Sequence, residues 1–263
     1  MENNYKAIGY LKCDEKYRFE TPRQGVLADN TGVIELNAQC NFEQAALDLE
    51  GFDRIWVIYD FHLNTTWKPK VKPPRSKDNK KISVFATRSP HRPNSIGMSC
   101  VQLERVEGRN IFIKNFDLLH NTPILDIKPY LPYSDSFPDS KTGWLPGDIE
   151  PTHHCIFSKL ADEQSDFIHS AYGLNLKSFA DLQLSSDPLK GDRKRLFVID
   201  AQQNHYQLGC RTWRLHFTLT ESEVLISRIS SSYETEELAE GAADKYNDKQ
   251  VHRNFLNQFP NTL

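Results

Sequence analysis

The sequence predicts a mainly β protein, with a small antiparallel β-barrel domain at its N-terminus and a smaller α+β domain behind it. Residues 1–130 hold about six or seven short β-branched or aromatic runs, separated by turn residues and with hardly any helical periodicity. Such spacing is typical of antiparallel barrels and sandwiches rather than of parallel α/β sheets. Proline- and glycine-containing sequence over 129–151 then marks a domain boundary.

The first domain is expected to span 1–140, and its elements follow from local pattern. The strongest strand is 54–62, which is almost entirely β-branched or aromatic. Asn41 followed by Gln44 predicts the start of a short helix that ends at Gly51. Glu107-Gly108-Arg109 predicts a hairpin turn. Strands are expected at 5–13, 33–36, 54–62, 82–86, 101–106, 110–114 and 123–127, with a further strand or bend at 116–119.

Beyond the boundary, 141–230 is expected to form the small α+β domain. Strands are predicted at 155–159, 196–200 and 211–219, with a helix at 162–172. The remaining segment, 231–263, has six acidic and three basic residues and helical potential only around 236–244. We expect it to be an acidic polar tail with loose order.

Composition excludes several classes of protein. With 263 residues, 38% of them hydrophobic and 25% charged, the chain has the composition of a soluble globular protein. It contains no apolar run of about 18 residues, so no transmembrane helix is expected. The first residues lack the apolar core of a secretion signal. Five scattered cysteines without a CxxC pair indicate reduced thiols, and together these features predict a cytoplasmic protein.

The net charge of −3 conceals a strongly basic segment. From Trp67 to Arg92 there are nine basic residues against a single acid, Asp78. The segment is either a solvated loop or the contact surface for a polyanion such as a nucleic acid, and the neighbouring loop that carries Arg88 and Arg92 favours the polyanion. Trp67 could stack on an unpaired RNA base or serve as a core or dimer residue.

The familiar catalytic signatures are absent. The twelve glycines never show the G-x-G-x-x-G spacing, and the chain has neither a Walker A motif nor a G-x-S-x-G motif. No two of the nine histidines are spaced as HxxxH, so we expect no metal site.

Residues 83–99 carry the most informative run of the chain, Ser-Val-Phe-Ala-Thr-Arg-Ser-Pro-His-Arg-Pro-Asn-Ser-Ile-Gly-Met-Ser. Its two prolines fix the backbone and restrict the residues before them. Arg88, His91 and Arg92 therefore lie on a stiff scaffold, which suits recognition, although a rigid surface turn explains the same composition equally well.

Several polar runs together resemble one family. They are Pro22-Arg23-Gln24, Lys72-Pro-Pro-Arg75, Phe85-Ala-Thr-Arg-Ser, His91-Arg-Pro-Asn, Ile96-Gly-Met-Ser and Asp126-Ile-Lys-Pro-Tyr-Leu-Pro132. Over about residues 5–140 the chain resembles the TrmO family, also called TsaA-like or YaeB-like, of S-adenosylmethionine-dependent tRNA methyltransferases. The resemblance implies a small all-β barrel and methylation of N6 of threonylcarbamoyladenosine, next to the anticodon of threonine tRNA. It also implies a homodimer.

The resemblance further implies a cofactor site built from loops at the barrel rim. The matching residues are Arg23, Gln24, Gly25, His62, Leu63, Arg88, Met98, Asp117, Leu118, Leu119, His120, Asn121 and Thr122. A base near N6 would help the transfer, and Asp126, His120 and His62 are the candidates, although a site that only orients the reactants remains an alternative. RNA contacts are expected at Lys68, Lys70, Lys72, Arg75, Arg92, Lys190 and Arg193, so the α+β domain at 141–230 is also expected to contact tRNA.

The chain departs from the family pattern at three places. The usual Asp-Gly-Thr-Pro is His120-Asn121-Thr122-Pro123, and Asn-Pro-Ile-Gly is Asn94-Ser95-Ile96-Gly97. A later Asp-Pro-Arg-Pro-like motif is Asp187-Pro188-Leu189-Lys190. Two other functions stay open: a non-catalytic RNA-binding barrel, and a methyltransferase that acts on a small molecule.

Overall fold

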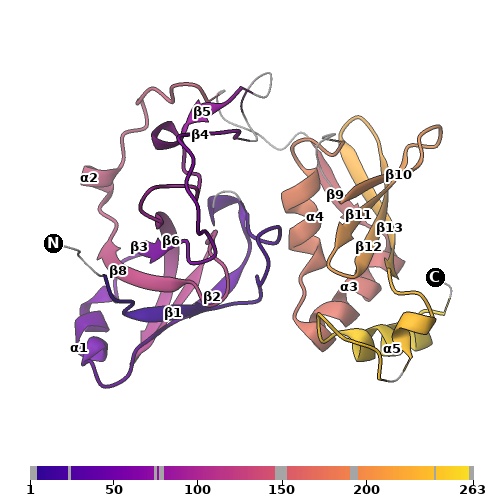
Figure 1. Ribbon diagram of the computed structural model, residues 1–263, viewed down its shortest axis with the longest axis horizontal. Coiled ribbons are helices and arrows are strands. Elements are labelled where there is room, and N and C mark those ends of the chain that lie inside the picture. The colour runs from indigo at the N-terminus through magenta and orange to yellow at the C-terminus, as the bar shows by residue number, and fades with distance from the viewer. Residues whose placement is uncertain are drawn as a thin grey trace. The chain divides into compact units, whose positions relative to one another are not determined.

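The computed structural model describes residues 5–22, 25–73, 76, 80–145, 153–189, 195–239 and 241–260, the side chain of Leu27 excepted. The chain divides into two compact units, Met1–Asp148 and Ile149–Leu263 (Figure 1). The predicted barrel domain therefore lies within the first unit. The segment 231–263 belongs to the second unit.

The first unit is built around a closed antiparallel barrel, as the sequence predicts. Its strand order is β1-β2-β7-β6-β3-β8, and every neighbouring pair runs antiparallel. The strands are β1 (Gly9–Lys12), β2 (Thr31–Leu36), β3 (Arg54–Asp60), β6 (Ile96–Glu107), β7 (Asn110–Lys114) and β8 (Pro123–Pro129). Because the barrel closes on itself, none of these strands presents a free edge.

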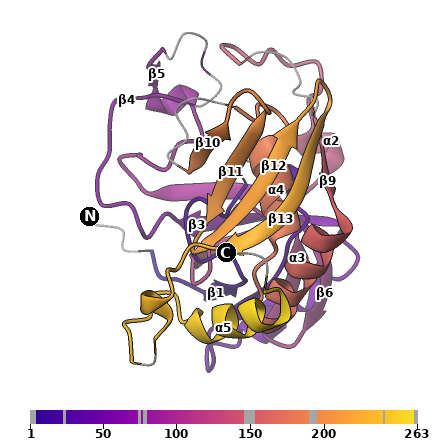
Figure 2. The same cartoon turned by 90° about the vertical axis from the view of Figure 1, so that its right-hand side faces the viewer.

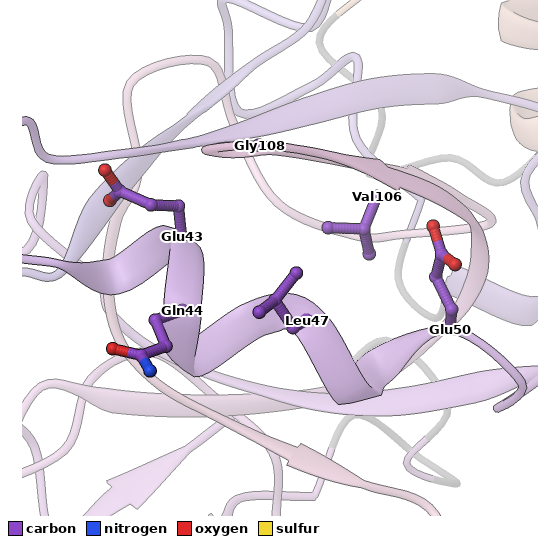
Figure 3. Close-up of a pocket in the computed structure, with 6 residues that line it drawn as sticks. All are labelled: Glu43, Gln44, Leu47, Glu50, Val106 and Gly108. Carbon is purple, nitrogen blue, oxygen red and sulfur yellow. The ribbon is translucent and has the colours of Figure 1, made fainter.

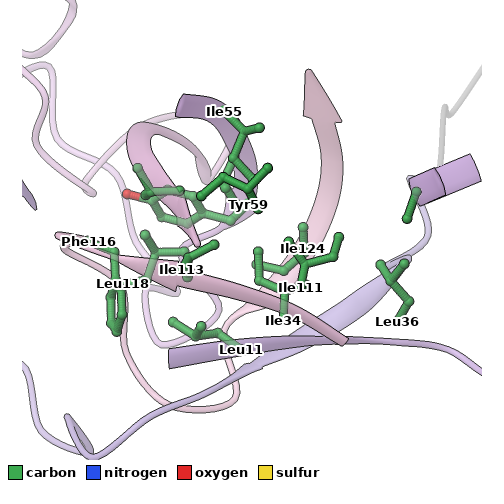
Figure 4. Close-up of a cluster of buried hydrophobic side chains, with 14 residues drawn as sticks. Leu11, Ile34, Leu36, Ile55, Tyr59, Ile111, Ile113, Phe116, Leu118 and Ile124 are labelled. Carbon is green, nitrogen blue, oxygen red and sulfur yellow. The ribbon is translucent and has the colours of Figure 1, made fainter. Parts of the chain in front are cut away.

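Alternation along the strands fills the barrel with apolar side chains. In β3, Ile55, Val57 and Tyr59 are buried, whereas the residues between them are half-buried. Aliphatic residues of the other strands meet them in one core (Figure 4). Phe116 and Leu118, which follow β7, are also buried in this core and close one end of the barrel.

That end carries the long loops, and we call it the loop end. The strands β1, β3 and β7 finish there, while β2, β6 and β8 begin there. Antiparallel pairing therefore brings the segments 13–30, 61–95 and 115–122 to the same end of the barrel. The segment 61–95 adds β4 (Lys70–Val71), β5 (Ile82–Ser83) and η4 (Val84–Ala86), of which the two strands pair with each other.

The opposite end is covered by α1 (Phe42–Ala46) and η2 (Leu47–Leu49), where the sequence predicts a helix. Asn41 precedes α1, but its side chain bonds to the side chain of Gln44 at 2.7 Å and does not cap the backbone. Its backbone lies in the left-handed region at φ 55°, so its side-chain oxygen does not accept from the first helical N–H groups.

Three other local expectations differ from the structure. β6 begins at Ile96, five residues before the expected strand, because Ile96 and Gly97 pair with the end of β3. The expected strand 82–86 turns into η4 after Ser83. Residues 116–119 form no strand, since Phe116 and Leu118 are used to plug the barrel.

The second unit is a five-stranded sheet with helices packed on it (Figure 2). The sheet order is β10-β11-β12-β13-β9, in which β9 alone runs parallel to its neighbour. The strands are β9 (His154–Phe157), β10 (Leu196–Asp200), β11 (His205–Cys210), β12 (Trp213–Leu219) and β13 (Glu223–Ser231). The helices are α3 (Lys159–Tyr172), α4 (Leu176–Leu184) and α5 (Lys249–Gln258).

The expectation of a loosely ordered acidic tail differs from what the described residues show. Residues 236–238 form the short η5, and α5 follows with Phe255 and His252 fully buried. The ring of Trp213 in β12 stacks on His252 at 3.6 Å between centroids. Burial of two aromatic rings holds this segment against the sheet, although its sequence is mostly polar.

Candidate functional site

The loop 115–122 is fastened to β1 at the loop end of the barrel. The N–H of Asn121 donates to the carbonyl of Leu11 at 2.7 Å, and the N–H of Leu11 donates to the carbonyl of Thr122 at 3.1 Å. Lys12 adds a bond from Nζ to the side-chain oxygen of Asn121 at 2.8 Å. These hydrogen bonds hold the backbone of the loop against β1. The loop contains six of the predicted cofactor residues.

Asn121 shows how this chain accommodates one departure from the family pattern. Its φ is 60°, in the left-handed region that glycine adopts most easily. In the pattern that the chain resembles, glycine stands at this position, and asparagine is among the residues that tolerate the conformation at low cost. The turn is therefore retained without glycine.

A polar cluster lies inside the barrel near the loop end. Tyr59 of β3 and Ser99 of β6 place their hydroxyl oxygens 3.3 Å apart, and the Ser99 hydroxyl donates to the carboxylate of Asp117. The side chains of Tyr59 and Ser99 are buried. Gly97 pairs with Tyr59 across the strands, and a Cβ on Gly97 would lie 2.4 Å from the tyrosine ring. Glycine at 97 thus makes room for the ring.

The electrostatics of this cluster centre on Asp117. Burial raises the pKa of Asp117, while the hydrogen bond from Ser99 and the nearby positive charge of Arg88 partly offset that effect. Burial and the negative Asp117 raise the pKa of Tyr59. Asp117 itself is half-buried, and a carboxylate with few compensating charges in apolar surroundings is stabilised by a cationic partner. Arg88 is exposed and provides the positive charge of the same region.

His120 is oriented by the backbone of Cys13, the residue after β1. The N–H of Cys13 donates to Nδ1 of His120 at 3.2 Å, so a neutral ring carries its proton on Nε2. Burial, followed by the charge of Lys12, lowers the pKa of His120. The imidazole is therefore suited to donate a hydrogen bond from Nε2 at neutral pH.

His62 and Leu63 follow the end of β3. The N–H of Phe61 donates to the carbonyl of Ser95 at 2.7 Å, and the carbonyl of Leu63 accepts from Arg18. His62 is half-buried and Leu63 is exposed. The Ser95 hydroxyl donates to Asp60, so the serine that replaces the family proline bonds the start of β6 to the end of β3.

In the loop 83–99 the two arginines, Arg88 and Arg92, differ in their contacts. Arg92 donates from Nη1 to the carbonyls of Thr87 at 2.8 Å and Val84 at 3.2 Å, and its guanidinium lies over the Phe85 ring. Arg88 is exposed. Arg92 therefore stabilises the loop, and its predicted contact with RNA stays a prediction, as does the predicted contact of Arg88 with the cofactor.

Two predicted site residues lie on the outer face of the barrel. Met98 is 54% exposed and alternates with Ser99, so its side chain points away from the cluster of Tyr59, Ser99 and Asp117. Asp126 forms an ion pair with Lys128 at 2.9 Å and accepts from the N–H of Ile127 at 2.9 Å. The structure does not bring Asp126 into the interior cluster.

Some of the remaining predicted site residues are described by the structure, and others lie outside the described residues. Gly25 begins η1 (Gly25–Leu27), and its backbone packs so tightly against Asn115 that a Cβ would lie 2.3 Å from the Asn115 carbonyl oxygen. Leu118 and Thr122 are buried, and Leu119 accepts a backbone bond from Thr122. Lys68, Lys70 and Lys72 are exposed. Arg23, Gln24, Arg75, Lys190 and Arg193 lie outside the described residues.

Sequence reasoning did not include Tyr59 and Ser99 in the site. The available signal was their parity: Tyr59 continues the buried series of Ile55 and Val57, and Ser99 precedes Val101 by two positions. A polar residue at an inward position of a barrel strand requires a hydrogen-bond partner inside. Strand parity therefore places both hydroxyl groups inside the barrel, but it does not show that they meet each other or Asp117.

A separate hollow lies at the opposite end of the barrel (Figure 3). It is lined by Glu43, Gln44, Leu47, Glu50, Val106 and Gly108, and its volume is about 250 Å³. Sites for drug-sized ligands usually enclose about 300–1,000 Å³ and are mostly apolar. This small hollow with acidic residues is therefore a weaker candidate than the loop end.

The described ranges offer neither a metal centre nor a membrane span. They contain no group of three His, Cys, Asp or Glu side chains that could hold a metal ion. Among the same residues, no helix is long and apolar enough to cross a membrane.

Residues 10–136 match the family model of the tRNA-methyltransferase O N-terminal domain. A tRNA (adenine(37)-N6)-methyltransferase of Eikenella corrodens is 48% identical over 183 residues, which cover 68% of this chain and 97% of the relative. The enzyme of the same name from Escherichia coli K12 is 34% identical over 197 residues, covering 72% of this chain and 83% of the relative. The chain spans only 60% of the length of a Pseudomonas aeruginosa protein named RcsF, at 43% identity over 143 residues.

Solved structures extend the likeness over most of the chain. The crystal structure of TrmO from Pseudomonas aeruginosa matches with a TM-score of 0.65 and 26% identity, over 88% of this chain and all of that one. A further TrmO crystal structure matches with a TM-score of 0.64 and 27% identity, over 87% of this chain and 99% of the other. The fold of both units is thus shared with solved proteins. The chain belongs to the tRNA-methyltransferase O (TrmO) family.

Proposed function

We propose that this protein transfers a methyl group from S-adenosylmethionine to N6 of threonylcarbamoyladenosine, next to the anticodon of threonine tRNA. One observation carries the proposal: the chain spans 97% of the Eikenella corrodens relative at 48% identity, and that relative is named a tRNA (adenine(37)-N6)-methyltransferase. Family membership supports the reaction class. The threonylcarbamoyl group is the finer part of the proposal and needs its own test.

The side chains at the loop end suit the chemistry of the methyl donor. S-adenosylmethionine carries a sulfonium and an ammonium group, and the half-buried carboxylate of Asp117 offers a negative partner. The carboxylate of S-adenosylmethionine needs a cationic partner, and the exposed Arg88 offers one. We propose that Asp117 and Arg88 bind the charged groups of the donor. The rest of the loop 117–122, together with Gly25, His62 and Leu63 from two other loops, would line the site. When bound, the donor supplies the electrophilic methyl group.

The acceptor nitrogen carries an acyl group, so its lone pair is delocalised and its proton is comparatively acidic. Methyl transfer proceeds in line and needs the two reactants held in register. Orientation of this kind can contribute about 7–11 kcal/mol to lowering a barrier. We propose that orientation is the main contribution of this site.

The candidate bases differ in how their geometry supports such a role. His120 uses Nδ1 to accept from Cys13, which favours a donor role for Nε2. Asp126 is bound to Lys128 on the outer face, which favours a positioning role. His62 follows β3 at the loop end and is half-buried, so it is the candidate that we favour for proton removal.

The basic segment supplies the proposed RNA contacts of the first unit. Lys68, Lys70 and Lys72 are exposed on and beside β4, where they can meet tRNA phosphates. Arg75, Lys190 and Arg193 complete the proposed set from the sequence. We also propose that the protein works as a cytoplasmic homodimer, as its resemblance to the family implies.

The experiment that separates the three open functions is transfer of labelled methyl from S-adenosylmethionine to tRNA. One tRNA sample carries the threonylcarbamoyl group and a matched sample lacks it. Transfer only to the modified sample supports the proposal. Binding of tRNA without affinity for S-adenosylmethionine would indicate a non-catalytic RNA-binding barrel, and donor binding without transfer to either sample would indicate a small-molecule methyltransferase.

A further inference from the structure

The inward side of β6 changes from apolar to polar where the strand meets the loop end of the barrel. Val101 and Leu103 are buried and apolar, whereas Ser99 and Gly97 occupy the inward positions nearer the loop end. An aliphatic side chain in place of Ser99 would simply continue the core. A buried hydroxyl group costs free energy unless it is hydrogen-bonded, so Ser99 needs an explanation beyond packing.

The ring of Tyr59 is held in place by its neighbours in the barrel core (Figure 4). Tyr59 pairs with Gly97 across β3 and β6, and a Cβ on Gly97 would lie 2.4 Å from the ring. The ring of Phe61 meets that of Tyr59 edge-on, with 5.1 Å between centroids. These two contacts fix the ring and therefore the position of its hydroxyl group.

The oxygen atoms of Tyr59, Ser99 and Asp117 form one chain of hydrogen bonds. The Ser99 hydroxyl has a single proton, which it donates to the carboxylate of Asp117. The 3.3 Å bond between Tyr59 and Ser99 therefore uses the tyrosine proton. Both protons are thus directed toward the carboxylate, and hydrogen bonds of this direction stabilise its ionised form.

The bond from Ser99 opposes the effect of burial on Asp117. Burial raises the pKa of Asp117, and Ser99 is the largest influence that lowers it, followed by the backbone N–H of Asp117 and the charge of Arg88. Burial also raises the pKa of Tyr59, so its hydroxyl stays protonated and remains a donor at neutral pH. Without Ser99 the carboxyl group of Asp117 would be neutral over a wider range of pH.

The backbone beside Asp117 is fixed without help from Ser99. The side chain of Asn30 accepts from the N–H of Phe116 and donates to its carbonyl, each at 3.1 Å. Phe116 and Leu118 are buried on either side, while Asp117 is half-buried. Removing the Ser99 hydroxyl is therefore expected to change the charge and direction of the carboxylate more than the course of the loop.

We infer that Ser99, supported by Tyr59, is a positioning residue that keeps the carboxylate of Asp117 ionised and directed toward a cationic group of the methyl donor. The inference rests on the proposed function, because it takes Asp117 as a ligand of S-adenosylmethionine. Neither hydroxyl group reacts. Both act on the donor through Asp117.

The test compares the full-length wild-type chain with Ser99→Ala and Tyr59→Phe. The carbon NMR signal of the Asp117 carboxyl group follows its protonation, and titration calorimetry follows the binding of S-adenosylmethionine, both from about pH 8 to about pH 4.5. Ser99→Ala removes a bond that favours the ionised form, so Asp117 should gain its proton at higher pH. Donor affinity should accordingly begin to fall at higher pH and be about tenfold weaker at neutral pH. Tyr59→Phe should act in the same direction by about threefold.

Two further variants serve as controls. The Ser95 hydroxyl donates to Asp60 just before β6, so Ser95→Ala removes a similar serine–aspartate bond that does not involve Asp117. It should leave the titration of Asp117 unchanged. In the Asp117→Asn background no carboxyl group remains to titrate, so adding Ser99→Ala should change donor affinity by less than about twofold.

The outcomes separate this inference from the proposed function. Wild-type protein that binds no S-adenosylmethionine, or Asp117→Asn with unchanged donor affinity, would contradict the proposed donor site and the inference with it. If Asp117→Asn weakens binding while Ser99→Ala titrates and binds as Ser95→Ala does, the inference alone is wrong. Equal weakening by Ser99→Ala at every pH, with an unshifted Asp117 titration, would assign Ser99 a packing role and also overturn it. Thermal unfolding checks the barrel, and Tyr59→Phe, which keeps the ring, decides the test if Ser99→Ala does not fold.

Discussion

At the scale of single residues, Asp117 has the most informative environment of the loop end. It receives a bond from Ser99, which also contacts Tyr59, and these three side chains come from two strands and a loop. Apolar residues surround them in the barrel. A carboxylate in such surroundings is retained at a cost in stability, so we connect it with ligand binding.

Asp117→Asn is therefore expected to weaken the binding of S-adenosylmethionine by about tenfold or more, because a charge-assisted contact becomes neutral. Titration calorimetry measures the change. The matched control is Glu104→Gln on the outer wall of the barrel, where Glu104 pairs with Lys114. Equal donor affinity of the Asp117 variant and the control would remove Asp117 from the donor site.

Asn121 leads to a prediction about stability. Its φ of 60° suits asparagine or glycine, whereas alanine is strained there. We expect Asn121→Ala to lower the free energy of unfolding by about 1 kcal/mol or more, and Asn121→Gly to have a smaller effect. Denaturant unfolding compares the two variants. An alanine variant as stable as the glycine variant would contradict the backbone argument.

At the scale of elements, the second unit contains two buried histidines, His216 and His252, whose pKa the fold lowers. Burial lowers the pKa of His216 to about 4, helped by Arg228 and His205. Burial also lowers the pKa of His252, although Asp248 opposes that effect. Below about pH 6.5 the unfolded chain binds protons at these positions that the folded chain does not bind.

This difference in bound protons determines how the free energy of unfolding changes with pH. The unfolded state binds more protons between about pH 6.5 and pH 4, so the stability of the second unit is expected to fall as the pH falls through this range. Hydrogen-exchange protection of β12 and β13, corrected for the intrinsic exchange rate, measures it. His216→Asn is expected to reduce the pH dependence. Constant protection between pH 6.5 and pH 5 would contradict the prediction.

Sequence pattern predicts some elements better than others for physical reasons. The strands expected at 54–62 and 110–114 could be predicted because β-branched and aromatic residues dominate the first and a Glu-Gly-Arg turn precedes the second, and the structure has them at Arg54–Asp60 and Asn110–Lys114. α5 could not, because most of its residues are polar and its order depends on Phe255 packing under the sheet. β11, β13 and α4 were also absent from the expected elements, since their pairing and packing partners lie far along the chain.

The candidate site divides in the same way. Its loops could be identified from polar motifs that resemble a family. The contact of Tyr59, Ser99 and Asp117 could not be identified from the sequence, because it depends on the register of the barrel strands. Tyr59 lies 40 positions before Ser99, and Ser99 lies 18 positions before Asp117. The outward positions of Met98 and Asp126 likewise follow from strand parity and not from the motifs themselves.

At the scale of the whole molecule, the placement of positive charge matters more than its total. The first unit has exposed lysines at 68, 70 and 72. The net charge of the protein is −3, so attraction to RNA depends on where positive charge is concentrated. Binding should accordingly depend strongly on salt.

Replacing Lys70 and Lys72 with glutamine is expected to flatten the salt dependence of tRNA binding by about 0.7–0.9 log units per log unit of salt for each phosphate that is no longer neutralised. Donor affinity should stay unchanged, because both lysines are exposed outside the polar cluster of the barrel. Filter binding over a series of salt concentrations measures the slope, with Lys159→Gln as the control. An unchanged slope would move the RNA surface of the first unit elsewhere.

The reaction proposed for this protein is methylation of the acylated N6 of threonylcarbamoyladenosine. The most direct test is mass spectrometry of the nucleosides released from threonine tRNA after incubation with the protein and S-adenosylmethionine. We expect threonylcarbamoyladenosine with one added methyl group, and no methylated product from tRNA that lacks the threonylcarbamoyl group. A methyl group on another nucleoside, or on unmodified adenosine at the same position, would contradict the proposed reaction.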